Sequence, residues 1–186
     1  MKKIISLFQR NYDTDRLVRD EVVPGAEWVL NGEGTPTRKW DGTCCLVENG
    51  KLFKRYELKK GKQPPSGFVA AQGPDLVTGE IPGWVPVGEG NEDRWHRAAL
   101  TSAPIPLTDG TYELVGPHIN GNPDKFENEQ LVPHGKNLVL SCPRTFEELR
   151  SFFKGADIEG IVWWRDINDP NCDKVKIKKK DFGLKR

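Results

Sequence analysis

Residues 37–58 read TRKWDGTCCLVENGKLFKRYEL and contain two extended segments around a tight turn. Segments 43–47 and 52–58 are rich in β-branched, aromatic and other apolar residues, and Asn49-Gly50 lies between them. Asn-Gly between two such segments is the strongest short-range signal for a β-hairpin. The sequence therefore predicts a hairpin, with Lys39 directly before it on a rigid sheet.

Lys39 is a candidate nucleophile because it stands two residues before Asp41-Gly42. A lysine amine attacks only after losing its proton, so chemistry at Lys39 needs a pKa lowered by burial or by neighbouring cations. The pattern Lys-x-Asp-Gly is too short to establish this by itself. An exposed lysine paired with Asp41 at a turn gives the same four residues.

Composition limits the classes of protein to which the chain can belong. Its 186 residues are enough for one domain with a proper core. The 28 Lys and Arg residues are balanced by 27 Asp and Glu residues, so the net charge of +1 favours no particular partner. The four cysteines include no Cys-x-x-Cys pair. This spacing argues for a reduced cytoplasmic protein and against a disulfide scaffold or a zinc site.

The hydropathy pattern gives no sign of a membrane protein. No stretch approaches the length of a membrane-spanning helix, and the apolar run after Met1 is too short for a signal peptide. We therefore expect a soluble, cytoplasmic protein with no membrane association. The sequence indicates no obligate protein partner.

The residue pattern along the chain predicts many strands and few helices. Segment 11–21 predicts a short helix or an ordered loop, and the capping pattern at Thr145 begins a helix that ends at Gly155. The sum is an α+β fold of mostly antiparallel sheets in a single domain over residues 1–186, with a Gly/Pro-rich insertion over residues 62–107. Strands are expected at residues 3–8, 27–30, 81–87 (an edge strand, because of its prolines), 111–115, 138–140, 158–164 and 174–178.

Charged residues recur within these expected strands. Glu113 and Glu159 lie among apolar residues, where an ionised carboxylate needs a partner or a ligand. Strict alternation in segment 174–178 puts three lysines on one face of its strand. Each has an ordinary explanation: a buried ion pair with an arginine for Glu113, a strand bulge at Glu159, and a solvated edge for the lysines.

Considered together, these residues suit a nucleotide. Cations fit a triphosphate, and carboxylates among them fit a hydrated divalent metal, since magnesium prefers oxygen ligands and keeps several waters. Attack of a lysine on a nucleotide α-phosphate requires such a set, because cations and a metal must offset the charge that develops on the phosphoryl oxygens.

In chain order these residues resemble the motifs of the covalent nucleotidyltransferases, which comprise DNA ligases, RNA ligases and mRNA capping enzymes. The motifs are Lys39-Trp-Asp-Gly, Arg55, Tyr112-Glu113-Leu114, Glu159-Gly-Ile-Val and Lys176-Ile-Lys178. The resemblance is closest to the 5′–3′ RNA ligase family that has a vertebrate member, and it covers the chain from about residue 35 onward. Further similar stretches are Ile81-Pro-Gly-Trp-Val-Pro-Val, Trp95-His96, Ile119-Asn-Gly-Asn-Pro123, Val132-Pro-His-Gly135 and Phe182-Gly-Leu184.

Two departures from the other branches favour the RNA ligases. DNA ligases and capping enzymes usually carry an arginine where this chain has Cys44. The chain also ends soon after the last motif, which leaves no room for the OB-fold domain that those enzymes append. The resemblance thus implies an ATP-grasp-like adenylyltransferase domain with no OB-fold domain.

The resemblance also implies a three-step reaction and its cofactors. Lys39 takes AMP from ATP, the AMP moves to the 5′-phosphate of an RNA, and an RNA 3′-hydroxyl displaces it and seals the strand. ATP and Mg²⁺ or Mn²⁺ are the implied cofactors, RNA with 5′-phosphate and 3′-hydroxyl ends is the implied partner, and RNA repair is the implied role.

Site roles follow from the same resemblance. Arg55 and Glu113 would hold the phosphate and sugar side of the nucleotide, and Lys176 with Lys178 would neutralise phosphates. Waters around the metal would be held by Asp41, Glu113 and Glu159. The implied nucleotide-binding set is Thr37, Arg38, Lys39, Arg55, Glu113, Glu159, Lys176 and Lys178.

The RNA-binding surface is a further prediction, from residue type alone. Bases stack on aromatic side chains, and cations contact phosphates. Two short segments, 94–97 and 179–180, contain side chains of these types and are therefore predicted to bind RNA. The residues are Arg94, Trp95, Arg97, Lys179 and Lys180. The roles of His96, His118 and His134 stay open.

Two alternatives remain open at this point. A minimal DNA ligase or an mRNA guanylyltransferase shares the motifs and would differ in its nucleotide or its acceptor strand. A non-catalytic RNA-binding module would share the fold, although loss of the lysine or of the acidic pair would be its expected signature, and both are present here.

Overall fold

The computed structural model describes residues 1–76, 78–103 and 106–186, and these form two compact units. Unit 1 contains Met1–Lys3 and Asp41–His134, and unit 2 contains Ile4–Trp40 and Gly135–Arg186. Both are mixed α/β structures with mostly antiparallel sheets and few helices, as the sequence predicts. The assignment of residues 1–186 to one nucleotidyltransferase domain with an insertion stays a prediction.

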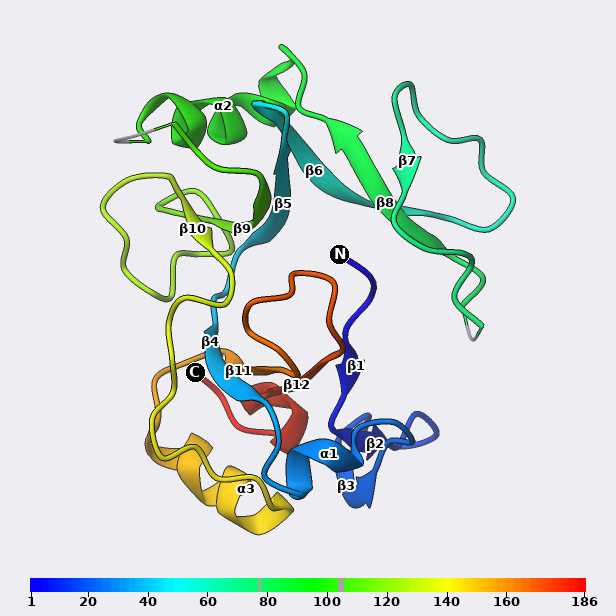
Figure 1. Cartoon of the computed structure of the whole chain (residues 1–186), viewed down its shortest axis with the longest axis vertical. Helices are drawn as coiled ribbons and strands as arrows, with labels where there is room; N and C mark the ends of the chain where they lie inside the picture. The colour runs from blue at the N-terminus through cyan, green and yellow to red at the C-terminus, as the bar shows by residue number, and fades with distance from the viewer. Residues whose placement is uncertain (77, 104–105) are drawn as a thin grey trace. The chain divides into compact units, whose positions relative to one another are not determined.

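Unit 1 is built on a six-stranded antiparallel sheet with the order β10-β9-β5-β6-β8-β7. Its centre is the predicted hairpin, in which Asn49 and Gly50 take positive φ angles of 51° and 70°, as a tight two-residue turn requires. Figure 1 shows this sheet with helix α2 beside it. The strands are β5 (Thr43–Glu48), β6 (Lys51–Leu58), β7 (Val69–Ala70), β8 (Ile81–Pro86), β9 (Gly110–Val115) and β10 (Gln130–Pro133), and α2 is Arg94–Thr101 after the 3-10 turn Asn91–Asp93.

The two faces of this sheet differ in chemistry. One face packs Cys45, Val47, Tyr112 and Leu114 into a hydrophobic core that also receives Ala99 of α2. Strand alternation then places Cys44, Arg55 and Glu113 on the other face. The same alternation that buries the core thus gathers the polar candidates.

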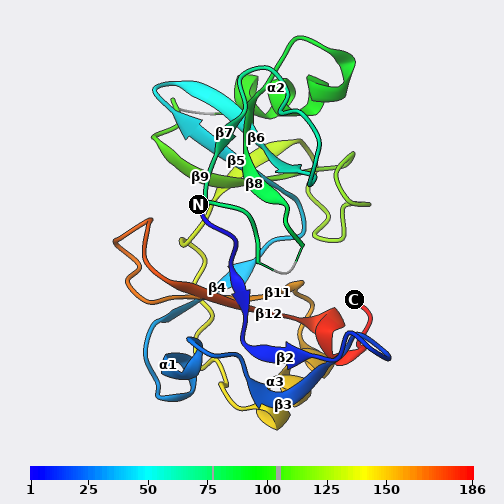
Figure 2. The ribbon, with the colours of Figure 1, turned by 90° about the vertical axis from the view of Figure 1, so that its right-hand side faces the viewer.

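Unit 2 is built on a four-stranded sheet with the order β1-β12-β11-β4. Only the β1–β12 pair is parallel. Figure 2 shows β1, β12 and β11 together with the β2–β3 hairpin. The elements are β1 (Ile5–Ser6), β2 (Phe8–Arg10), β3 (Val18–Val22), α1 (Glu27–Leu30), β4 (Thr35–Lys39), α3 (Phe146–Gly155), β11 (Gly160–Trp164), β12 (Lys174–Lys178) and the 3-10 turn Lys179–Phe182.

The core of unit 2 lies on one face of its sheet. Ile161, Trp163 and Ile177 point into it and are fully buried with Leu149 and Phe153 of α3. The helix forms because its apolar side chains recur at helical spacing and so face the sheet together. The opposite face of β4, β11 and β12 carries the lysines.

Several local predictions are wrong in an instructive way. Residues 27–30 form the single-turn helix α1 instead of a strand, and segment 138–140 contributes one bridge, between Leu138 and Thr37, instead of a strand. Segment 11–21 was expected to be a short helix or an ordered loop; its first part is an ordered turn, as the second alternative has it, and its last residues belong to β3. Strand β8 is paired on both sides and is no edge, although its outer neighbour β7 spans only two residues.

Candidate active site

The lysines of unit 2 converge because of strand register. Gly160 in β11 lies opposite Lys39 of β4 on one side and opposite Lys178 of β12 on the other. Residues directly opposite in a sheet share a face, so the two lysines flank a position that has no side chain. A Cβ atom at Gly160 would lie 2.3 Å from the carbonyl oxygen of Ile177, so only glycine fits.

Glu159 joins these two lysines. Its Oε2 accepts a hydrogen bond from Lys39 Nζ, and its Oε1 lies 2.9 Å from Lys178 Nζ. Burial by itself would raise the pKa of Glu159, but the two ammonium groups outweigh burial and hold the pKa below its usual value. The carboxylate therefore stays ionised and holds Lys39 in place, which confirms that Glu159 has a charged partner.

Lys176 extends the cationic face along β12. It shares the face of Lys178 by alternation, and it lies opposite Val162. Burial lowers the pKa of Lys176 to about 8, and the charges of Lys178 and Lys39 add to the effect. The amines of Lys39, Lys176 and Lys178 thus share this face, and that of Lys176 gives up its proton at mildly alkaline pH.

Thr37 and Arg38 point to opposite faces of β4. Thr37 is buried on the lysine face, where its hydroxyl donates to the Val162 carbonyl at 3.0 Å and accepts from Trp164 Nε1 at 3.2 Å. Arg38 stacks on Trp40, with its guanidinium carbon 4.1 Å from the ring centroid. It lines a separate pocket of about 630 Å³ formed with residues 136–140 and with α3 and the residues after it.

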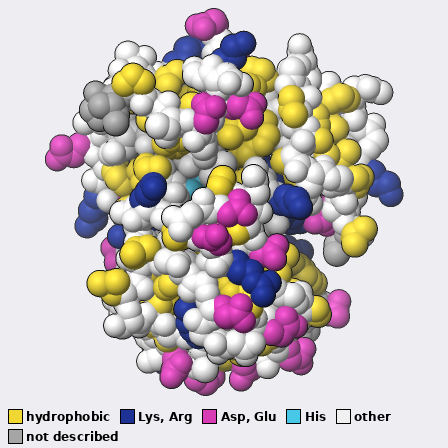
Figure 3. Space-filling model, in the orientation of Figure 1, with side chains coloured by type: hydrophobic (Ala, Val, Ile, Leu, Met, Phe, Trp, Pro, Cys, Tyr) yellow, Lys and Arg dark blue, Asp and Glu magenta, His cyan; other side chains and the backbone are white. Residues whose placement is uncertain are grey.

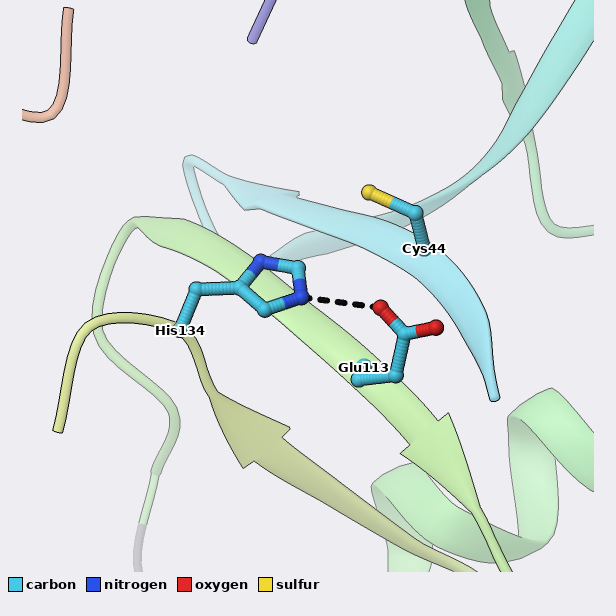
Figure 4. A group of neighbouring side chains, drawn as sticks. All are labelled: Cys44, Glu113 and His134. Carbon is cyan, nitrogen blue, oxygen red and sulfur yellow. Dashed lines mark hydrogen bonds and ion pairs between the residues drawn. The ribbon is translucent and has the colours of Figure 1, made fainter. Parts of the chain in front are cut away.

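Unit 1 holds the second group of candidates. Glu113 is 7% exposed, and its Oε2 lies 2.9 Å from Nε2 of His134. Cys44 lies directly opposite Glu113 in the sheet, and Figure 4 shows the thiol and the imidazole on the same side as the carboxylate. The sequence predicts that Glu113 needs a partner, and in the structure this partner is a histidine and not an arginine.

Arg55 and Asp41 belong to unit 1 as well. Arg55 shares the face of Glu113, lies 3.0 Å from Glu57 and sits over the ring of Trp84. Asp41 accepts a hydrogen bond from Asn120 at 3.2 Å. The glycine of the Lys-x-Asp-Gly pattern is required by packing, because a Cβ at Gly42 would lie 2.2 Å from the Leu114 carbonyl oxygen.

The oxygen donors predicted for a metal have different surroundings. Asp41 and Glu113 belong to unit 1 and Glu159 to unit 2, where both of its oxygens contact ammonium groups. Glu113 lies beside a thiol and an imidazole, which are donors that Mg²⁺ does not favour. With these surroundings, the carboxylates would suit Mg²⁺ through water and not as direct ligands.

Four of the five residues predicted to bind RNA make side-chain contacts within the protein, and the fifth, Lys180, is exposed. Trp95 stacks on His118 at 3.7 Å between centroids, and Arg94 also contacts the Trp95 ring. Arg97 donates to the carbonyl of Gly90 at 2.9 Å, and Lys179 donates to that of Ala156 at 2.8 Å. On the face drawn in Figure 3, basic side chains are scattered among acidic ones instead of forming one patch.

Sequence reasoning missed the grouping of Cys44 and His134 with Glu113. His134 follows β10, and its placement depends on the pairing of β10 with β9, which brings Val132 opposite Glu113. The one signal in the sequence is Val132-Pro-His-Gly135, which resembles a family stretch and contains the histidine. His96, also unresolved from sequence, is partly buried near Asp93, and burial lowers its pKa.

Comparisons with known proteins show which proteins this chain resembles in sequence. No protein-family model matches the chain. The protein named RNA ligase 1 of Pongo abelii is 29% identical over 69% of this chain and 62% of its own length. The Danio rerio protein of that name is 29% identical over 80% of this chain and 67% of its own length, and the Rattus norvegicus protein is 29% identical over 68% and 62%. The chain thus spans less than two thirds of the Pongo abelii and Rattus norvegicus proteins.

Among the described residues, no helix combines the length and apolar composition needed to cross a bilayer. The order of the motifs and the alignments both indicate similarity to RNA ligases. The chain is thus similar to the vertebrate proteins named RNA ligase 1, and this similarity supports membership of the RNA ligase family.

Proposed function

We propose that this chain is an ATP-dependent RNA ligase domain that uses Lys39 as its nucleophile. The observation that carries the proposal is the lysine cluster of unit 2, in which Glu159 holds Lys39 and Lys178 on one sheet face beside Lys176. The relatives named RNA ligase 1 support the reaction class and an RNA substrate.

The first step of the proposed reaction is self-adenylylation. Nζ of Lys39, after losing a proton, attacks the α-phosphorus of ATP; the P–N bond forms, and the bond from that phosphorus to the bridging oxygen breaks and releases pyrophosphate. Lys39 is paired with Glu159 in this structure, so ATP binding has to break this pair before attack. Lys176 and Lys178 offset the negative charge on the phosphates.

The next two steps transfer the AMP and seal the strand. An oxygen of an RNA 5′-phosphate attacks the AMP phosphorus, and the P–N bond to Lys39 breaks. An RNA 3′-hydroxyl then attacks the 5′-phosphate phosphorus and expels AMP. Such sealing of 5′-phosphate and 3′-hydroxyl ends fits a role in RNA repair in the cytoplasm.

Unit 1 contributes nucleotide contacts in this proposal. As the family resemblance implies, Arg55 contacts phosphate and Glu113 accepts from the ribose, and both side chains lie on the polar face of the unit 1 sheet. Asp41, Glu113 and Glu159 would hold waters of Mg²⁺ or Mn²⁺, and the ion would supply positive charge to offset that of the ATP phosphates. Thr37 fixes the β4 backbone beside Lys39, while Arg38 points to the other face.

Intact mass spectrometry tests the proposal directly. Protein freed of bound nucleotide and incubated with ATP and Mg²⁺ should gain the mass of one AMP. The Lys39→Ala variant should gain none, whereas Lys51→Ala, at the exposed first residue of β6, should react as the parent does. An adduct with GTP alone would indicate a guanylyltransferase, and no adduct from folded protein would leave the RNA-binding module.

The acceptor strand needs a second measurement. Adenylylated protein should transfer AMP to 5′-phosphorylated RNA and join it to a 3′-hydroxyl end. Faster sealing of a nicked DNA duplex than of any RNA would assign the chain to DNA ligation and refute the RNA ligase proposal.

A further inference from the structure

Three adjacent strands of unit 1 bring one metal-binding group each to the same face. Cys44 comes from β5, Glu113 from β9, and His134 follows β10. Their sulfur, carboxylate oxygen and ring nitrogen all lie within 4.8 Å of one another. Figure 4 shows the three side chains gathered on one face of the sheet. The described part of the chain contains no other group of this kind.

The histidine is already oriented as a metal ligand. Its Nε2 faces Glu113 at 2.9 Å, and its Nδ1 lies 3.0 Å from the hydroxyl of Thr111. Histidines that bind metals usually give their second ring nitrogen to such a partner, which fixes the tautomer and the ring orientation. The backbone N–H of His134 also donates to the Thr111 carbonyl, so the residue is held at two points.

The donor set indicates the class of metal. Thiolate, imidazole and carboxylate together are ligands of Zn²⁺ and similar transition metals, whereas Mg²⁺ and Ca²⁺ take oxygen. Tetrahedral Zn²⁺ with bonds of about 2.0 to 2.3 Å places its ligand atoms roughly 3.3 to 3.7 Å apart. Side-chain rotations that move the ligand atoms by about 1 Å would bring the three groups to that spacing.

We propose that Cys44, Glu113 and His134 form a binding site for a transition-metal ion of the Zn²⁺ class. The ion takes three ligands from the protein and keeps a fourth position for water. Binding exchanges the thiol proton of Cys44 for the metal and breaks the hydrogen bond between His134 and Glu113.

Occupation of the site has a consequence that rests on the proposed function. Glu113 is assigned there to the ribose of the nucleotide, and the carboxylate oxygen that binds Zn²⁺ no longer accepts that hydrogen bond. The ion therefore inhibits self-adenylylation, because it withholds Glu113 from the ribose and from the waters of the Mg²⁺ that accompanies ATP. The metal site itself is independent of this consequence.

Cobalt binding tests the site without any activity measurement. Co²⁺ added to the metal-free full chain should give the visible bands of a tetrahedral complex and a sulfur-to-cobalt charge-transfer band, saturating at one equivalent. Zn²⁺ should displace it. Absence of a one-to-one complex, or an octahedral spectrum without the sulfur band, would overturn the proposal.

Matched variants locate the ligands. Cys44→Ser should abolish the charge-transfer band, whereas Cys172→Ser, whose cysteine lies in unit 2, should leave it unchanged. Thr111→Val keeps all three ligands and removes the partner of His134, so Co²⁺ affinity should fall by about tenfold or more. A band that survives in Cys44→Ser refutes the assignment, and so does a Thr111→Val variant that folds and binds as tightly as the parent.

The inhibition is measured separately. Adenylylation of the parent in excess Mg²⁺ should fall as Zn²⁺ is added and recover with a chelator. Cys44→Ser should be less sensitive, with each protein compared with its own rate in Mg²⁺ alone. Cobalt bands from a protein that never adenylylates would refute the proposed ligase and keep the metal site, while adenylylation without cobalt binding would do the reverse.

Discussion

Glu159 is the residue on which the lysine cluster depends. It is the shared acceptor of Lys39 and Lys178, and it sits directly before the glycine that lets those lysines approach. Its ionisation is maintained against burial by the same two cations. A charge arrangement of this kind stabilises the fold and also prepares the proposed nucleophile.

Glu159→Gln should reduce the loss of unfolding free energy that occurs as the pH falls below neutral. Since the pKa of Glu159 is lower in the folded chain than its usual value of 4.5, the carboxylate stabilises the fold above that value. This contribution disappears as the pH falls through the folded pKa. Urea unfolding between neutral pH and about pH 3 measures it, and Glu147→Gln, an exposed residue of α3, is the control. If the free energy of unfolding fell equally in parent and variant as the pH was lowered, the expectation would be contradicted.

Lys176 is expected to cost stability at neutral pH. Its pKa is about 8 in the folded chain against 10.5 ordinarily, so protonation favours the unfolded chain. The penalty is absent above about pH 10.5, grows as the pH falls to 8, and is complete below that.

Lys176→Met should therefore raise the melting temperature at pH 7 by about 2 to 4 °C, equivalent to roughly 1 kcal/mol. The gain should shrink near pH 10, and adenylylation should fall at least tenfold. Lys180→Met, at an exposed position, should change neither quantity. Calorimetry at both pH values decides, and a destabilised Lys176→Met variant would show that the ammonium is well solvated.

At the scale of elements, two glycines of unit 2 give opposite expectations. A Cβ at Gly160 would lie 2.3 Å from the backbone oxygen of Ile177, so alanine there pushes β11 away from β12. A Cβ at Gly155, the last residue of α3, meets nothing within 4 Å. The first position tests close strand packing, and the second tests helix propensity alone.

Gly160→Ala should destabilise the chain by about 2 kcal/mol or more and should reduce adenylylation in the protein that remains folded, since overpacking displaces Lys39 and Lys178. Gly155→Ala should be neutral or stabilising by up to about 1 kcal/mol. Denaturant unfolding compares them. Equal changes in unfolding free energy from both substitutions would show that close packing of β11 on β12 does not require glycine at position 160.

The elements that sequence predicts well are those whose signals are local. The Asn49-Gly50 hairpin, helix α3 and the alternating strand β12 carry turn residues or periodicity in their own residues. Helix α1 was missed because four residues are too few to show a helical period, and burial of Trp28 and Val29 decides its conformation.

For the candidate site, the sequence predicts which residues matter better than it predicts their partners. The common face of the β12 lysines follows from alternation, and Glu113 and Glu159 were expected to need partners. The pairing of Glu113 with His134 and the stack of Trp95 on His118 depend on contacts between distant segments. No local pattern encodes such contacts.

At the scale of the whole molecule, charge predicts how RNA binding depends on salt. The net charge is only +1, and several cations make internal contacts. We expect contact with about three or four phosphates, so log Kd for a 5′-phosphorylated single strand should rise with log salt at a slope of roughly 2 to 3. Fluorescence anisotropy across a salt series measures it. A flat line would exclude phosphate contacts, and a slope above about 6 would indicate an extended basic surface.

The division of the chain between units also shapes the order in which the protein is assembled during synthesis. Once His134 has left the ribosome, every segment of unit 1 is available. Strands β1 and β4 of unit 2, by contrast, pair within their sheet only with β12 and β11. The strand that carries Lys39 therefore waits for more than a hundred further residues, since β11 begins at Gly160. Because contacts of such long sequence separation form slowly, Lys39 meets Glu159 late in folding, and an incomplete chain cannot assemble the lysine cluster.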